Sequence, residues 1–145
     1  MNRRTALQVL AGSAIAVGHV QAQSNAKRLA ITTLDSLGAD WSVFQYPMLG
    51  RPAILLRVPK AKEGRTLEVQ QNGGSQSIFL VSYYLICTHL GCTPAIPNQD
   101  HQLICPCHGS KFWAEDGRAA DNRPNPPLKS IQLEVVDNRV FALEA

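Results

Sequence analysis

All four cysteines of this 145-residue chain fall between Cys87 and Cys107, in two short motifs that also contain histidine. The first motif is CTHLGC, which begins at Cys87, and the second is CPCHGS, which begins at Cys105. Cysteines that serve only as core thiols or ordinary disulfides have no reason to cluster with histidines in this way. The clustering constrains the fold, because the surrounding structure must bring two separate loops together.

One pair of candidate ligands in each motif supplies thiolates and imidazoles in equal number. Cys87 and His89 form a Cys-x-His pair, and Cys105 and His108 form a Cys-x-x-His pair. This donor set suits an iron–sulfur or a zinc centre. Structural zinc sites usually contain a wider Cys-x(2–4)-Cys spacing, and zinc would leave two cysteines without a role. Disulfides alone would not account for the histidines. The residues therefore favour a two-iron, two-sulfur core over zinc or disulfides alone.

The sequence around the motifs is typical of short β-strands, because apolar or alternating runs are separated by Gly, Pro and Asn. The predicted strands lie at 41–46, 53–58, 66–70, 78–85, 131–136 and 139–143. Asp137 and Asn138 tolerate left-handed backbone, so they predict a tight hairpin. We therefore expect an all-β fold, a small antiparallel sandwich or barrel. The segment from Cys87 to about Pro127 would form a loop-built subdomain on it, stiffened by its prolines.

The N-terminal 22 residues have the features of an export signal. Arg3 and Arg4 precede a weakly apolar run from Ala6 to Val20, as in a twin-arginine signal, and Ala22 is a small residue suited to cleavage. The alternative is a retained anchor, although about 20 apolar residues are needed to span a bilayer. The predicted organisation is a signal or short anchor at 1–22, a linker and first-strand region at 23–40, and a cluster domain at 41–145.

Composition excludes several classes of function. Hydrophobic residues make up 45% of the chain, which supplies a core but not a multispanning membrane protein. The formal net charge is +3, and Arg3 and Arg4 account for two of those charges, so no basic patch indicates nucleic acid. No residue pattern supplies a catalytic base or nucleophile. We therefore expect any enzymatic activity to belong to a complex that contains this chain.

CTHLGC and CPCHGS resemble the two cluster-binding motifs of Rieske iron–sulfur proteins, in the form found in cytochrome bc-type complexes. The resemblance implies one [2Fe-2S] cluster, with Cys87 and Cys105 on one iron and His89 and His108 on the other. Neutral histidines in place of two thiolates make reduction easier and place the added electron on the histidine-bound iron. The histidines should face the redox partner, and the reduction potential should fall as pH rises above neutrality.

The resemblance also implies a disulfide between the remaining cysteines of the motifs, Cys92 and Cys107. Such a bond would tie the two loops together, and it suits an exported protein in an oxidising compartment. Leu90 corresponds to the apolar residue that shields the cluster. The segment from Arg123 to Pro127 stands where the family has a proline-rich covering loop. Asn125 departs from the Gly and Ala usual there, so a rigid surface turn is the alternative.

Ser110 and Phe112, which both follow the second histidine, bear on the reduction potential. Ser110 matches the family serine whose hydroxyl donates to a bridging sulfide. Phe112 stands where many relatives carry a tyrosine that donates to a ligand sulfur. A hydrogen bond to a charged acceptor contributes at most about 1.5–3 kcal/mol, roughly 60–130 mV for one electron, so we expect a lower potential. Tyr83 and Tyr84 could donate instead but are expected to pack.

Three other aromatic side chains are expected to have structural roles. We expect His101 to be an exposed loop residue and not a ligand. Trp41 and Trp113 are expected to belong to the core and not to an electron path.

The resemblance implies one-electron transfer, and two settings for it stay open. In the first, the chain is the iron–sulfur subunit of a cytochrome bc-type complex, which takes an electron from quinol at cytochrome b and passes it to a c-type cytochrome. In the second, it is a small subunit or soluble carrier of a periplasmic oxidoreductase, such as an arsenite-oxidase-like molybdenum enzyme. The bc-type spelling of the two motifs makes the first setting the leading expectation, whereas Phe112, the short chain, the weak anchor and the lack of a Gly/Ala hinge favour the second. Both settings predict the periplasmic side of a bacterial inner membrane, and the chain is too short for a dioxygenase catalytic domain.

Overall fold

The computed structural model describes residues 27–62, 64–88 and 91–144, and nearly all of their regular structure is β-strand. The strands are β1 (Arg28–Thr33), β2 (Val43–Met48), β3 (Arg51–Val58), β4 (Leu67–Gln71), β5 (Gln76–Tyr84), β6 (Gln102–Ile104), β7 (Lys111–Trp113), β8 (Leu133–Val136) and β9 (Arg139–Leu143). Two short 3₁₀ turns, η1 (Leu34–Leu37) and η2 (Asn72–Gly74), complete the elements. The predicted all-β class is confirmed. The predicted signal lies outside the described residues, among which no helix is long and apolar enough to cross a membrane.

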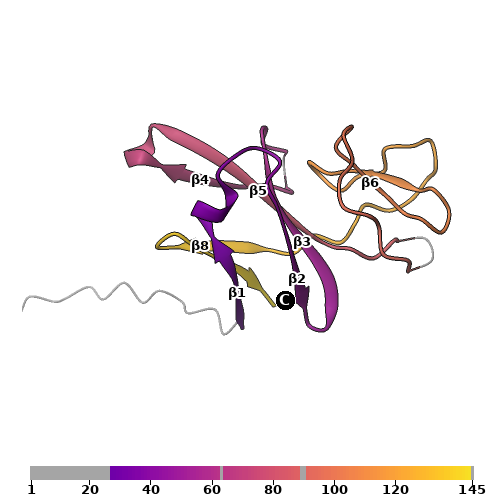
Figure 1. Cartoon of the computed structure of the whole chain (residues 1–145), viewed down its shortest axis with the longest axis horizontal. Coiled ribbons are helices and arrows are strands. Elements are labelled where there is room, and N and C mark those ends of the chain that lie inside the picture. Colours follow the sequence, from indigo (N-terminus) through magenta and orange to yellow (C-terminus); the bar gives the residue numbers. More distant parts are fainter. Residues whose placement is uncertain (1–26, 63, 89–90, 145) are drawn as a thin grey trace, which may run out of the picture.

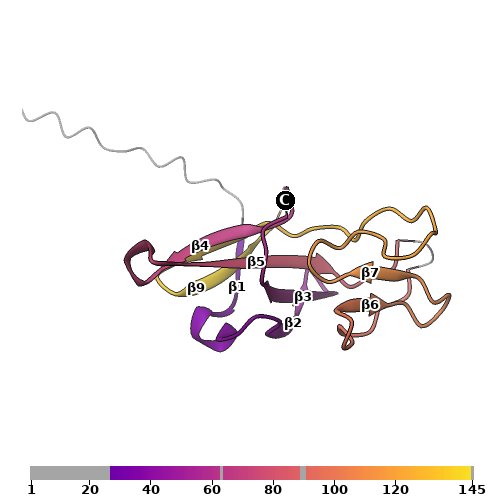
Figure 2. The same cartoon turned by 90° about the horizontal axis from the view of Figure 1, so that it is seen from above.

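The strands form three antiparallel sheets. One sheet has the order β2-β3-β5-β4, the second β1-β9-β8, and the third is the β6-β7 pair. The first two sheets make up one part of the molecule, which we call the body (Figure 1). Figure 2 shows β6 and β7 at one end, with the hairpin that joins β4 to β5 at the other. We call the β6-β7 pair and the loops around it, residues 87–128, the cluster end.

The two central strands of the four-stranded sheet, β3 and β5, are buried on both faces. On β3, Leu55 belongs to one hydrophobic cluster, which packs against the β1-β9-β8 sheet and includes Val140. Its neighbours Ile54 and Leu56 belong to a second cluster, which extends into the cluster end. Successive side chains of a strand point to opposite faces, so a strand buried on both sides needs apolar residues throughout. This explains why β3 contains the continuous run AILL.

The six predicted strands are all present, with ends shifted by up to two residues, which brings Pro47 into β2 and Pro52 into β3. Both prolines were expected to separate strands, and this was wrong, because they pair with each other inside β2 and β3. Pro47 lies on an edge strand, where a missing N–H is tolerated. The turn instead falls at Leu49 and Gly50, which have positive φ values of 53° and 74°.

The remaining elements were predicted in part. The hairpin at Asp137 and Asn138 is confirmed, since their φ values are 47° and 67°. Strand β1 falls in the predicted first-strand region, where it pairs with β9. Strands β6 and β7 have only three residues each and were not predicted.

Arg65 connects the body to the cluster end. Its Nε donates to the carbonyl oxygen of Asp116 (2.7 Å), and its Nη2 donates to the carbonyl oxygen of Leu128. Its guanidinium lies over the ring of Tyr83, 5.4 Å from the centroid. A Cβ on Gly117 would lie 2.7 Å from Arg65 Nη2 and 3.0 Å from the Tyr83 ring. We call this contact of Arg65, Tyr83 and Gly117 the joint.

Candidate metal centre

The first motif folds into a tight loop that begins and ends at a cysteine. The N–H of Gly91 donates to the carbonyl oxygen of Cys87 (2.9 Å), and the N–H of Cys87 donates to the carbonyl oxygen of Cys92 (2.6 Å). Gly91 has a φ of 76°, which a residue without Cβ adopts at little cost. His89 and Leu90, between these positions, lie outside the described residues.

The second motif repeats this backbone pattern. The N–H of Gly109 donates to the carbonyl oxygen of Cys105 (2.9 Å), and the N–H of Cys105 donates to the carbonyl oxygen of Ser110 (2.8 Å). Gly109 has a φ of 67°. The two loops are therefore built alike, with a cysteine at the first position and a left-handed glycine at the fifth. In the sequence, the two motifs share only this cysteine and this glycine in register.

The cysteines that open the two loops are buried, whereas His108 of the second loop is exposed. Cys87 is 2% exposed and Cys105 is fully buried, while His108 lies on the surface. Burial raises the pKa of the Cys105 thiol, and the neighbouring Cys87 thiol acts in the same direction. Hydrogen bonds from the backbone of Cys107 and His108 lower the pKa of Cys105. The site thus brings two thiols together and directs backbone donors at one sulfur. These donors offset part of the rise in the pKa and so act toward the thiolate form that binds a metal.

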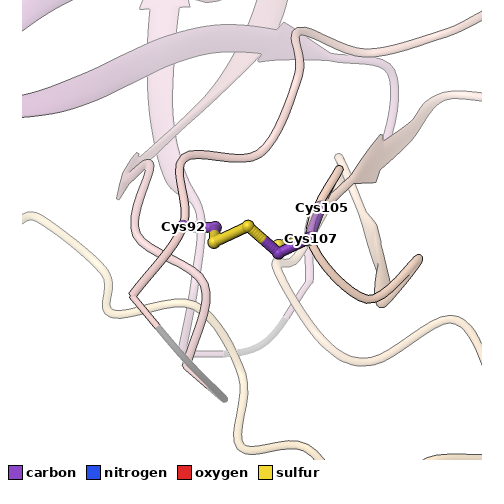
Figure 3. Close-up of side chains that lie close together, drawn as sticks. All are labelled: Cys92, Cys105 and Cys107. Atoms are coloured by element: carbon purple, nitrogen blue, oxygen red, sulfur yellow. A yellow bond between two sulfur atoms is a disulfide. The ribbon is translucent and has the colours of Figure 1, made fainter.

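The two loops are joined by a disulfide between Cys92 and Cys107, whose Cα atoms lie 6.3 Å apart. The sulfur atoms of Cys92, Cys105 and Cys107 all lie within 4.8 Å of one another. Figure 3 shows Cys105 beside this disulfide. Of these three cysteines only Cys105 retains a thiol, so only Cys105 can act as a thiolate ligand. The predicted pairing of Cys92 with Cys107 is confirmed.

The segment from Arg123 to Pro127 contacts both motif loops. Three side-chain hydrogen bonds make these contacts: from Thr88 Oγ1 to the Pro126 carbonyl oxygen (2.8 Å), from Arg123 Nη1 to the His108 carbonyl oxygen, and from Asn125 Nδ2 to Ser110 Oγ (3.2 Å). A surface turn unrelated to the site would not make these contacts. The segment therefore packs against the two loops, as the predicted covering loop requires.

The structure places Phe112 in the centre of the cluster end. It is fully buried, lies on β7 opposite Leu103, and belongs to the second hydrophobic cluster. The hydroxyl of Tyr83 donates to the carbonyl oxygen of Ala114 (3.1 Å), so Tyr83 supports the joint. Tyr84 packs in the first hydrophobic cluster. The prediction that both tyrosines have packing roles is confirmed.

Two expectations for aromatic residues near the site were wrong. Trp113 was expected in the core but is 39% exposed, because it alternates with the buried Phe112 on the short strand β7. His101 was expected to be exposed but is half-buried, because its ring stacks on Trp41 with centroids 3.7 Å apart. Trp41 itself packs against the second hydrophobic cluster, as expected.

The described residues fit a [2Fe-2S] centre. Two buried thiols and an exposed imidazole come from two matching loops, and the remaining two cysteines form a disulfide instead of competing as ligands. A zinc site with Cys92 or Cys107 as thiolate ligands is incompatible with that disulfide. When bound, such a cluster supplies one-electron oxidation and reduction. An all-β domain that presents this pair of loops at one end is a Rieske domain.

Comparison with known proteins shows the family directly. Residues 40–132 match the model of the Rieske [2Fe-2S] domain. This chain therefore belongs to the Rieske family and carries one [2Fe-2S] cluster for electron transfer. It is 31% identical over 152 residues to cytochrome b6-f complex iron-sulfur subunit 1 of Synechocystis, across 97% of this chain and 83% of that protein. It is 32% identical to iron-sulfur subunit 3 of a Nostoc species, across 97% and 84%.

Solved structures support the same fold. The plasma membrane Rieske protein PetC3 of Synechocystis aligns with a TM-score of 0.55 at 20% identity, over 81% of this chain and 99% of that one. The quaternary ammonium Rieske monooxygenase CntA aligns with a TM-score of 0.59 at 16% identity, over 80% of this chain but only 31% of that one. The domain therefore occurs both as a separate protein and inside larger enzymes.

Two features that organise the site were missed from the sequence. Arg65 acts on carbonyl groups 51 and 63 residues away, and no local pattern signals such contacts. The hydrogen bond from Asn125 to Ser110 was also missed. One signal for it existed, namely the departure of Asn125 from the Gly and Ala usual in the covering loop.

Proposed function

We propose that this chain is the iron–sulfur subunit of a cytochrome bc-type complex, with its cluster held by Cys87, His89, Cys105 and His108. The observation that carries the proposal is the similarity to two cytochrome b6-f iron-sulfur subunits across 97% of this chain and 83% and 84% of theirs. In that role the chain takes an electron from quinol at cytochrome b and passes it to a c-type cytochrome.

The geometry at the loops supports this role. The buried thiols of Cys87 and Cys105 would lie on the protein side of the centre, and the exposed His108 would lie on the partner side. An exposed imidazole can contact a partner and exchange a hydrogen bond or a proton with it, whereas a buried thiolate is out of the partner's reach. The chain therefore presents the edge that a quinol-oxidising site needs.

The disulfide supports a location on the periplasmic side of a bacterial inner membrane. Disulfides persist in the periplasm and are rare in the cytosol. The twin-arginine-like segment at 1–22 would export the chain and, if retained, would associate it with the membrane. The same proposal includes the limits of the three parts of the chain, a signal or anchor at 1–22, a linker and first-strand region at 23–40, and the cluster domain at 41–145.

The second candidate is a small subunit or soluble carrier of a periplasmic oxidoreductase. The observation in its favour is Phe112, a fully buried side chain without a hydroxyl where many bc-type relatives carry tyrosine. The missing donor lowers the expected potential, which would suit a donor or acceptor other than those of a high-potential quinol-oxidising complex.

The test is to purify the tagged full-length chain from membranes of its own organism, as wild type and as His108→Ala. A bc-type subunit should co-purify with b-type haem and with quinol-dependent reduction of cytochrome c. His108→Ala should lose the Rieske electron paramagnetic resonance signal and that activity. His101→Ala is the matched control, because it removes a histidine that is not a proposed ligand, and it should retain both.

Two results would overturn the proposal. Co-purification with a molybdenum-containing subunit in place of b-type haem would establish the second candidate. A normal Rieske signal in His108→Ala would contradict the ligand set.

A further inference from the structure

Asn125 is the only side chain of the described covering segment that contacts a buried polar side chain of the second motif. Its Nδ2 donates to Ser110 Oγ over 3.2 Å. Ser110 is only 1% exposed, and Asn125 is half-buried. Because water has little access to Ser110, its hydroxyl depends on hydrogen-bond partners inside the site, and the Asn125 amide is one of them.

The backbone fixes the position of each partner in this hydrogen bond. The Ser110 carbonyl oxygen accepts the N–H of Cys105, which ties the serine to a ligand cysteine. The N–H of Asn125 donates to the carbonyl oxygen of Arg123 (2.8 Å) across Pro124. This is a three-residue turn whose central φ is fixed by the proline ring.

The covering segment is also anchored on both sides of Asn125. Before it, the Arg123 guanidinium donates to the carbonyl oxygen of His108. After it, Thr88 Oγ1 donates to the carbonyl oxygen of Pro126. The amide of Asn125 is therefore held against Ser110 by contacts to both motif loops, and its placement does not depend on one weak bond.

The polarity of the bond decides what the serine can do. Asn125 Nδ2 carries only hydrogens to donate, so Ser110 Oγ is the acceptor and its own proton remains to be donated. Among the residues that the structure describes, Ser110 Oγ donates to none. A buried hydroxyl needs an acceptor, and the acceptors that the proposed ligand set adds next to Ser110 are cluster sulfurs.

We propose that Asn125 is a positioning residue that raises the reduction potential of the cluster by acting through Ser110. Its amide holds the serine oxygen as an acceptor, which directs the hydroxyl proton toward the cluster sulfur and polarises it. A stronger donor stabilises the more negative, reduced state. This inference rests on the proposed ligand set and concerns a residue at which this chain departs from its family.

The experiment is a double-mutant cycle on the full-length chain with its cluster, read out as the one-electron potential in a spectroscopic redox titration. Ser110→Ala removes the donor and should lower the equilibrium constant for reduction by about tenfold, equivalent to about 59 mV. Asn125→Ala keeps the Ser110 hydroxyl but removes the amide that orients it, and should lower this equilibrium constant by about twofold. In the Ser110→Ala background, Asn125→Ala should change the potential by no measurable amount.

Two further variants make the test specific. Asn122→Ala removes an exposed amide from the same loop that makes no side-chain hydrogen bond with a described residue, and it should leave the potential unchanged. Asn125→Asp keeps the size of the side chain, so it protects the test if Asn125→Ala loosens the loop. Its carboxylate can only accept from Ser110, so the potential should fall further than in Asn125→Ala. The fall caused by Asn125→Asp should be smaller when Ser110 is already alanine.

Three outcomes would overturn the inference. They are an unchanged potential in Asn125→Ala, a fall in potential of the same size when Ser110 is already alanine, or a rise in the potential of Asn125→Ala. A rise would mean that Ser110 had been donating to Asn125. A role limited to holding the loop would shorten the lifetime of the cluster and leave the potential unchanged. Failure of the proposed ligand set is recognised separately, since His108→Ala would then keep its Rieske signal.

Discussion

The body and the cluster end of this molecule are stabilised in different ways. In the body, β5 alone has nine residues and pairs along its length with β3 and β4, and β3 and β5 are buried on both faces. In the cluster end, β6 and β7 have three residues each, and the remaining chain is held by a disulfide, left-handed glycines and side-chain hydrogen bonds to backbone carbonyls.

This difference separates stability from function. The body gains its stability from apolar burial, which requires no cofactor. The cluster end has few ladder hydrogen bonds, so its loops depend on cross-links that fix the ligands in place. The second hydrophobic cluster and the joint at Arg65 extend across both parts. We therefore expect the two parts to respond differently to changes in each type of contact.

The disulfide is expected to give the largest difference between the two parts. Cys92→Ser combined with Cys107→Ser opens a loop of 15 residues, which lowers the free energy of unfolding by about 3 kcal/mol in the chain-entropy account. The cluster absorbance should be lost at lower denaturant concentration, while the far-UV circular dichroism of the body should change later. Chemical denaturation followed by both signals measures this separation. Coincident loss of the two signals in the variant would show that the parts unfold as one unit.

The joint should give the next largest effect. Gly117→Ala places a Cβ against Arg65 and Tyr83 at a φ of 73°, so the arginine must move away from its two carbonyl acceptors. We expect a loss of about 2–3 kcal/mol, from the left-handed backbone and from overpacking.

The matched control for the joint is Gly50→Ala, in the turn between β2 and β3. Its φ is 74°, and nothing lies within 4 Å of the added Cβ. It should therefore cost only the backbone term, about 1–2 kcal/mol. The difference in the free energy of unfolding between these variants measures the contact at the joint. Equal losses would show that Arg65 gives way freely and that the joint contributes little.

The same contrast explains what could be predicted from the sequence. The strands of the body follow from local apolar patterns, and the ligand motifs from the spacing of cysteine and histidine, because both signals lie within a few residues. The joint depends on Arg65, whose acceptors are distant in the chain. The exposure of Trp113 depends on the register of a three-residue strand, which is too short to show an alternating pattern. Long-range contacts of single side chains were therefore missed where regular structure is scarce.

Two buried tyrosine hydroxyls, one in the body and one at the joint, are expected to give the smallest effects. The Tyr46 hydroxyl lies 2.6 Å from Ser82 Oγ, and since Ser82 donates to the carbonyl oxygen of Ile54, Tyr46 is the donor. The Tyr83 hydroxyl donates to Ala114 at the joint. Replacement of either tyrosine by phenylalanine should lower the free energy of unfolding by about 1 kcal/mol. Only Tyr83→Phe should also bring cluster loss to a lower denaturant concentration.

Alkaline pH tests the burial of the two tyrosine hydroxyls. Burial raises the pKa of Tyr46 to about 12 and raises that of Tyr83 as well. The folded state therefore keeps protons that the unfolded state releases above about pH 10, the ordinary tyrosine value. The stability from each buried tyrosine is fully present below pH 10 and is lost as pH rises through the raised pKa. Tyr46→Phe should make the free energy of unfolding fall less steeply between pH 10 and 12. An unchanged slope would contradict the burial of a protonated Tyr46, because that residue would then titrate alike in both states.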